Sequence, residues 1–155
     1  MLAGSACERG DKAEVARVDS VKNDSVFAAL QKRGEMTMGV DQYTSMHRFE
    51  PLPDGGLIVL QRDSADSAGE ATIRAHVRVI ATAFAAGDFT SPEFVHATDT
   101  VPGTAVMSRL KGEITYAASD LPRGGEVRIT TKNAAGVKAI HDFLAFQRMD
   151  HHAGM

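Results

Sequence analysis

One pattern occurs twice in this chain and constrains its fold more than any other feature. Leu-Pro-x-Gly-Gly, followed by alternating apolar and polar residues, stands at 52–63 and again at 121–132. Paired glycines allow the positive φ of a hairpin turn, and proline fixes the φ of the preceding turn residue. Each copy therefore predicts a β-hairpin, whose first strand lies at 43–50 in one copy and at 113–118 in the other.

A helical pattern of apolar residues follows each predicted hairpin. The first helix is expected over about 68–86, with Ser67 as its N-cap and Gly87 as its C-terminal stop. The second is expected over about 134–149, with Asn133 as its N-cap. Each copy of the repeat is thus a β-β-α unit.

The two units predict an α+β fold. They cover about 43–87 and 112–150, and their hairpins are expected to form a four-stranded antiparallel sheet covered on one face by both helices. The connection at 88–111 is too long for an ordinary loop, and a short helical segment is expected at 102–110. Long insertions of this kind often carry binding function.

The chain ahead of the repeats is expected to form two parts. Residues 1–24 are interpreted as a signal remnant and a flexible tether, because they are polar and poor in aromatic residues. A single domain is expected over 25–155, opening with a short helix at 24–34 that ends at Gly34.

The only cysteine lies at the end of a run of small residues. The segment Gly4-Ser5-Ala6-Cys7 resembles the lipobox of bacterial lipoproteins, although Gly4 stands where leucine is usual and no charged or apolar region precedes it. The resemblance implies a lipid on Cys7, a location in the bacterial cell envelope or periplasm, and membrane contact only through that lipid. The alternative is a disordered tail with an incidental cysteine.

The composition favours an ordinary globular domain. Of 155 residues, 43% are hydrophobic, which is enough for a packed core, and a single cysteine cannot form an internal disulfide. The net charge is -3 and the basic residues are scattered, so the sequence argues against a nucleic-acid partner.

Six histidines supply most of the metal-binding chemistry in the sequence. Imidazole nitrogen suits zinc, copper and nickel. His76 and His141 lie at similar depths in the two expected helices, so helix packing would bring them together, with His96 above them from the connection. Against this, the first two flank their apolar stripes on opposite sides, and a histidine in such a place is commonly a satisfied boundary residue.

Thioether sulfur adds a softer set of candidate ligands. Met36 and Met38 are expected in an extended segment, which would place both sulfurs on one face. Thioether together with imidazole selects copper over harder cations, so copper is favoured over zinc. His152 would lie nearly in line with His141 if the second helix continued that far. The weaker candidate ligands are His47, Met46, Met107, His151 and His152.

No catalytic motif accompanies these residues: the sequence has no nucleophile elbow, no Walker loop and no dinucleotide-binding glycine pattern. The leading hypothesis is a non-enzymatic, envelope-tethered metal-binding protein, with His76, His96 and His141 as its main ligands. The alternative is an envelope interaction or structural domain, which would bind a partner protein through its open sheet face or its long connection.

Overall fold

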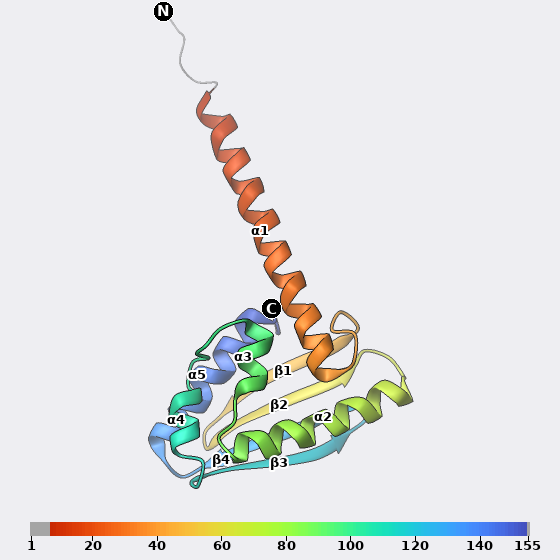
Figure 1. The fold of residues 1–155 in the computed structure, drawn as a ribbon, viewed down its shortest axis with the longest axis vertical. Helices are drawn as coiled ribbons and strands as arrows, with labels where there is room; N and C mark the ends of the chain where they lie inside the picture. Colours follow the sequence, from red (N-terminus) through yellow and green to blue (C-terminus); the bar gives the residue numbers. More distant parts are fainter. Residues whose placement is uncertain (1–6, 155) are drawn as a thin grey trace, which may run out of the picture.

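The computed structural model describes residues 7–154. These residues form, in order, α1 (Cys7–Met38), β1 (Ser45–Leu52), β2 (Gly55–Arg62), α2 (Ser67–Ala85), α3 (Thr90–His96), α4 (Thr104–Arg109), β3 (Ile114–Leu121), β4 (Gly124–Thr131) and α5 (Ala134–Asp150) (Figure 1). None of the helices in this range is both long enough and apolar enough to span a membrane.

The strands form one antiparallel sheet in the order β1-β2-β4-β3, and α2 and α5 pack on it, so the predicted α+β fold is confirmed. The two repeats meet at the central β2–β4 pair. Ile58 pairs there with Val127, and these two residues occupy the same position in the repeated pattern. The duplication in sequence is therefore an approximate two-fold symmetry of the sheet.

Each long helix packs mainly on the hairpin of the other repeat. Helix α2 lies over β3 and β4, whereas α5 lies over β1 and β2. The second glycine of each turn permits each helix to pack on the hairpin of the other repeat. A Cβ on Gly56 would collide with Leu144 of α5, and a Cβ on Gly125 would lie 2.9 Å from Val77 of α2. These glycines let each helix approach the backbone of the sheet closely.

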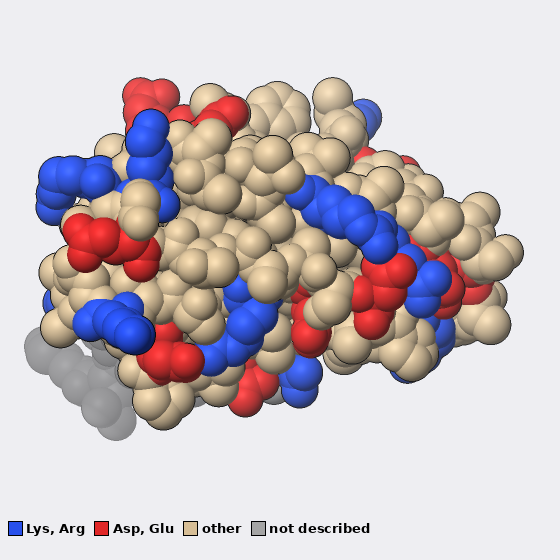
Figure 2. Space-filling view, turned by 90° about the horizontal axis from the view of Figure 1, so that it is seen from below, with Lys and Arg blue, Asp and Glu red and all other residues tan. Residues whose placement is uncertain are grey.

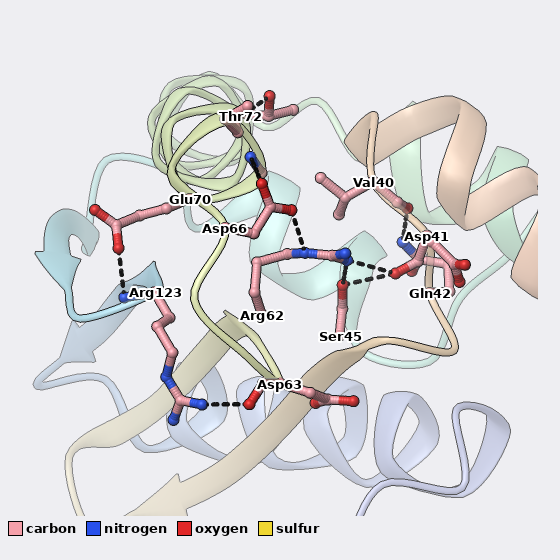
Figure 3. Close-up of polar contacts among 12 residues, drawn as sticks. Val40, Asp41, Gln42, Ser45, Arg62, Asp63, Asp66, Glu70, Thr72 and Arg123 are labelled. Atoms are coloured by element: carbon pink, nitrogen blue, oxygen red, sulfur yellow. Dashed lines mark hydrogen bonds and ion pairs between the residues drawn. The ribbon is translucent and has the colours of Figure 1, made fainter.

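One glycine of each turn was expected to hold a positive φ, and this is right for only one hairpin. Gly55 has φ +146°, but in the second turn Arg123 takes the positive φ, at 64°. The backbone N–H of Arg123 donates to Glu70 Oε2 at 2.8 Å, which helps to hold it there (Figure 3). Gly124 is required for a different reason, because a Cβ on it would collide with the carbonyl oxygen of Leu60.

Helix α1 differs from the expected tether and short helix. It runs without a break through Cys7–Met38 and ends at Gly39, whose φ is +78°, instead of at Gly34. Between Cys7 and Arg33 the sequence has no proline and only one glycine, so nothing stops a helix there. Gly4, Ser5 and Ala6 of the lipobox-like segment lie outside the described residues.

The other helices begin close to their expected positions. Asn133 is the N-cap of α5 as predicted, and its Oδ1 accepts from the N–H of Ala135 at 3.0 Å. The N-cap of α2 is Asp66 instead of Ser67, because its carboxylate accepts from the N–H of Gly69 at 3.0 Å. The connection holds α4, where a helical segment was expected, and also α3, which was not predicted.

Arg62 ties the loop between α1 and β1 to the start of α2. Its Nε donates to Asp66 Oδ2 at 3.0 Å, and its Nη1 donates to the Asp41 carbonyl at 2.9 Å and to Ser45 Oγ at 2.6 Å (Figure 3). Gln42, in the same loop, is buried and donates to the Val40 carbonyl at 2.8 Å. These bonds fix the chain that leads from α1 into β1.

Charges of both signs are interspersed over the face of the molecule shown in Figure 2. Ion pairs on the surface of the protein include Arg78 with Asp120 and Arg128 with Asp54, each at 2.5 Å. Such exposed pairs contribute little to stability individually. On the face shown in Figure 2, the interspersed positive and negative side chains leave no extended area of one sign.

Candidate functional site: a histidine-lined pocket

A pocket of about 80 Å³ lies between the sheet and four of the helices. It is lined by Gly34, Thr37, Met38, Gln42, His47, Phe49, Ile58, Leu60, His76, Ile80, Phe84, Ser91, Pro92, Val95, His96, Phe143, Gln147 and His151. The wall is mainly apolar, and four of the six histidines of the chain are part of it. No Asp, Glu, Lys or Arg is among the described residues that form the lining.

The four histidines come from four different elements. His47 lies in β1 two residues before Phe49, and strand alternation places both on the core face of the sheet. His76 lies in α2, one turn before Ile80, so these two also share a face. His96 is the last residue of α3, and His151 is the C-cap of α5. Only the folded chain brings them together.

The ring of His151 lies against two of the other imidazoles. Its centroid is 5.1 Å from that of His47, with the rings nearly parallel at 13°. It is also 5.1 Å from the centroid of His96, with the rings nearly perpendicular at 83°. Phe49 packs against the same ring, with centroids 5.7 Å apart.

Burial keeps three of these imidazoles neutral near pH 7. It lowers the pKa of His47 to about 4, helped by the neighbouring His76. Burial likewise lowers the pKa of His76 to about 4. The pKa of His151 falls to about 3, because burial and then the adjacent His47, His96 and His152 disfavour its charged form. Neutral imidazole is the form that binds metal ions.

His96 is held by partners at both ring nitrogens. Its Nδ1 donates to Asp150 Oδ2 at 2.5 Å, and its Nε2 lies 2.9 Å from Gln147 Oε1. The side chain is 1% exposed, so these contacts fix the ring. Two other polar atoms of the pocket, Gln147 Nε2 and His151 Nδ1, are buried and have no hydrogen-bond partner among the described residues. Unpaired buried polar atoms are costly and rare, so a ligand that bonds to them would gain affinity.

The structure brings His76 and His96 to this pocket but places His141 elsewhere. The Nε2 of His141 donates to the Leu52 carbonyl at 2.8 Å, at the β1–β2 turn, so it is a satisfied boundary residue. His152 does not continue the line of His141 along α5, because that helix ends at Asp150. The ring of His152 instead stacks on Phe27 of α1, with centroids 4.2 Å apart and an interplanar angle of 1°.

The methionines are distributed differently from the expectation. Met36 and Met38 belong to the last turn of α1, so the extended segment predicted for them is wrong. The two side chains have different surroundings. Met38 is 5% exposed and lines the pocket, whereas Met36 is 68% exposed. Met107 is fully buried in the hydrophobic core, and Met46 is 40% exposed on β1 and lines no part of the pocket.

The side chains are not arranged around a metal ion as they stand. Within residues 7–154, no group of three or more His, Cys, Asp or Glu side chains has positions suited to hold one. The near-parallel rings of His47 and His151 explain part of this, because stacked imidazoles do not direct their nitrogens at a common point. The pocket nonetheless gathers borderline imidazole nitrogens and one soft thioether, beside the harder amide oxygens of its two glutamines.

Two pocket residues were only weaker candidates in the sequence. The alternation of β1 could have identified His47, because it shares a face with the apolar Phe49. Helical spacing could have identified Gln147 and His151, because both continue the buried face of α5 from Ile140 and Leu144. No family model, no curated protein and no solved structure matches this chain.

Proposed function

We propose that this domain is a non-enzymatic metal-binding protein whose site is the histidine-lined pocket. One observation carries the proposal: four histidines from four separate elements line a single, mainly apolar pocket. Partly buried histidines reduce stability unless they are paired, so such a cluster calls for a function. Copper is preferred over zinc because a thioether lies in the same wall.

His47, His76 and His151 are the proposed ligands. Burial keeps each neutral, and Nδ1 of His151 has no hydrogen-bond partner. The rings of His47 and His151 would turn out of their stacked arrangement to face an ion. Such rotation is inexpensive because χ2 of histidine has broad minima. Both ring nitrogens of His96 are engaged, so we propose that this residue is a fixed part of the pocket wall that limits the rotation of the neighbouring rings.

The test is metal analysis of protein purified without a histidine tag, followed by calorimetric titration with copper and zinc. His47→Phe and His151→Phe should each weaken binding at least about tenfold, since removing even an outer-shell group often costs that much. His141→Gln is the matched control, because this histidine lies outside the pocket. Wild-type protein that is metal-free and binds neither ion would contradict the proposal, as would equal affinities in all four proteins.

We also propose that Cys7 carries a lipid that anchors the domain in the bacterial envelope. The support is the resemblance of Gly4-Ser5-Ala6-Cys7 to a lipobox. The test is expression from the gene with its upstream in-frame codons, with labelling by a radioactive fatty acid. Wild type should incorporate label and Cys7→Ser should not. Wild-type protein without label would exclude the anchor.

A further inference from the structure

The wall of the histidine-lined pocket contains only uncharged donors, and this bears on the ion that it can take. Imidazoles, two glutamine amides and the Met38 thioether line it, and none of the described lining residues is a carboxylate. The nearest acid in the hydrogen-bond network is Asp150, which bonds to the side of His96 away from Gln147. The lining residues would therefore supply no negative charge to neutralise a bound ion.

Charge decides between ions in such surroundings. The solvation cost of moving an ion from water into a low-dielectric interior grows with the square of its charge, so a divalent ion loses roughly four times as much as a monovalent one. Many zinc sites offset this cost with thiolate or carboxylate ligands, and the three-histidine sites leave the fourth position to water or substrate. With neutral donors alone, a monovalent ion is the better match.

The softness of the donors also favours a monovalent ion, namely Cu(I). Met38 comes from the last turn of α1, is 5% exposed, and lines the pocket together with His47, His76 and His151. Thioether sulfur is a soft ligand, and Cu(I) is among the ions that soft sulfur ligands favour. Zinc sites, by contrast, are almost always four-coordinate and seldom use thioether.

We infer that the pocket is selective for Cu(I) and that Met38 Sδ is a ligand of the ion alongside the imidazoles. This inference rests on the proposed metal-binding function. It adds the oxidation state and names the residue that sets the selectivity. Met107 supplies the internal comparison, since it is also buried but belongs to the core and does not line the pocket.

The test compares full-length wild type, Met38→Leu and Met107→Leu. Cu(I) affinity is measured anaerobically, with a reductant, by competition with a chromophoric Cu(I) chelator, and Zn(II) affinity by competition with a fluorescent chelator. Methionine-to-leucine exchange conserves volume, so both variants should fold. Met38→Leu should lose at least about tenfold in Cu(I) affinity with Zn(II) affinity unchanged, and Met107→Leu should match wild type in both.

X-ray absorption at the copper edge provides a readout that does not depend on the variants folding. Wild type should show a sulfur neighbour at copper, and Cys7→Ser should retain it, which excludes the single cysteine as its source. Absence of that sulfur, binding of copper only as Cu(II), or equal losses of Cu(I) and Zn(II) in Met38→Leu would overturn the inference while leaving metal binding intact. Wild type that binds neither ion would overturn the proposed function itself.

Discussion

Acidification from pH 7 to pH 5 should destabilise the metal-free protein steeply, because three partly buried imidazoles resist protonation. Their pKa values are about 4 for His47 and His76 and about 3 for His151, against 6.5 in the unfolded chain. Between pH 6.5 and pH 4 the unfolded state therefore binds more protons than the folded state. Stability must rise with pH across that window and fall as the solution is acidified.

The size of the effect follows from these values. Each histidine contributes about 1.4 kcal/mol per pH unit inside the window, so each removes about 2 kcal/mol of stability at pH 5. The three together remove about 6 kcal/mol, which is comparable with the whole stability of many small domains. The aspartates with lowered pKa values, Asp54, Asp66 and Asp88, titrate below 3.8 and so act outside the window.

The assay is urea unfolding at pH 7, 6 and 5, with a chelator present. His76→Leu should reduce the loss between pH 7 and pH 5 by about 2 kcal/mol, because it removes one of the three sites. Ile80→Val, which trims the same pocket without changing a titratable group, should lower stability by about 0.5–1.5 kcal/mol equally at every pH. Unfolding free energies that agree at pH 7 and pH 5 in wild type would refute the reasoning, because they would show that these imidazoles are hydrated.

Three further substitutions and one deletion test the fold, each by thermal or urea unfolding. Gly124→Ala should destabilise by more than about 1 kcal/mol despite its negative φ, because the new Cβ meets the Leu60 carbonyl, and a neutral effect would contradict the close approach. Arg123→Gly should be neutral or stabilising by up to about 1 kcal/mol, since it relieves a positive φ; a larger loss would mean that the arginine contacts outweigh that strain. Met107→Ala should cost about 2–5 kcal/mol through the cavity it leaves, and a smaller cost would show that the core collapses around it. Removal of residues 1–23 should shift the melting midpoint by less than about 4 °C, because exposed residues such as Val21 make no core contacts.

The hairpins could be predicted because the repeated turn is a local signal. Proline and paired glycines determine a turn within a few residues, and strand alternation then assigns the faces. The continuous helix α1 could not be predicted in the same way. Polar residues such as those at 8–24 fit either a solvated helix or a flexible chain, because neither requires an apolar face.

The candidate site was harder to predict, since it is assembled from distant parts of the chain. His76 and His96 were expected to share a site and do share a pocket, but the exchange of helices between repeats places His141 at the β1–β2 turn. His151 follows Leu144 by seven residues and Gln147 by four, so the buried face of α5 continues to it although the helix ends at Asp150. The sequence does not show, however, that β1 and α3 bring His47 and His96 to the same place.

The C-terminal end of helix α1 forms part of the pocket wall, and the rest of the helix extends away from it. Its last turns supply Gly34, Thr37 and Met38 to the wall, and Arg33 Nε donates to the Val95 carbonyl beside His96 at 2.7 Å. The stack of Phe27 on His152 joins the same helix to the residue after His151. From Phe27 to Cys7 the helix extends about 30 Å, so a tilt of about 10° at its base would displace the far end by about 5 Å. If a ligand in the pocket favours one orientation of α1, thermodynamic reciprocity requires that restraint of the far end in that orientation raise the affinity for the ligand by the same factor.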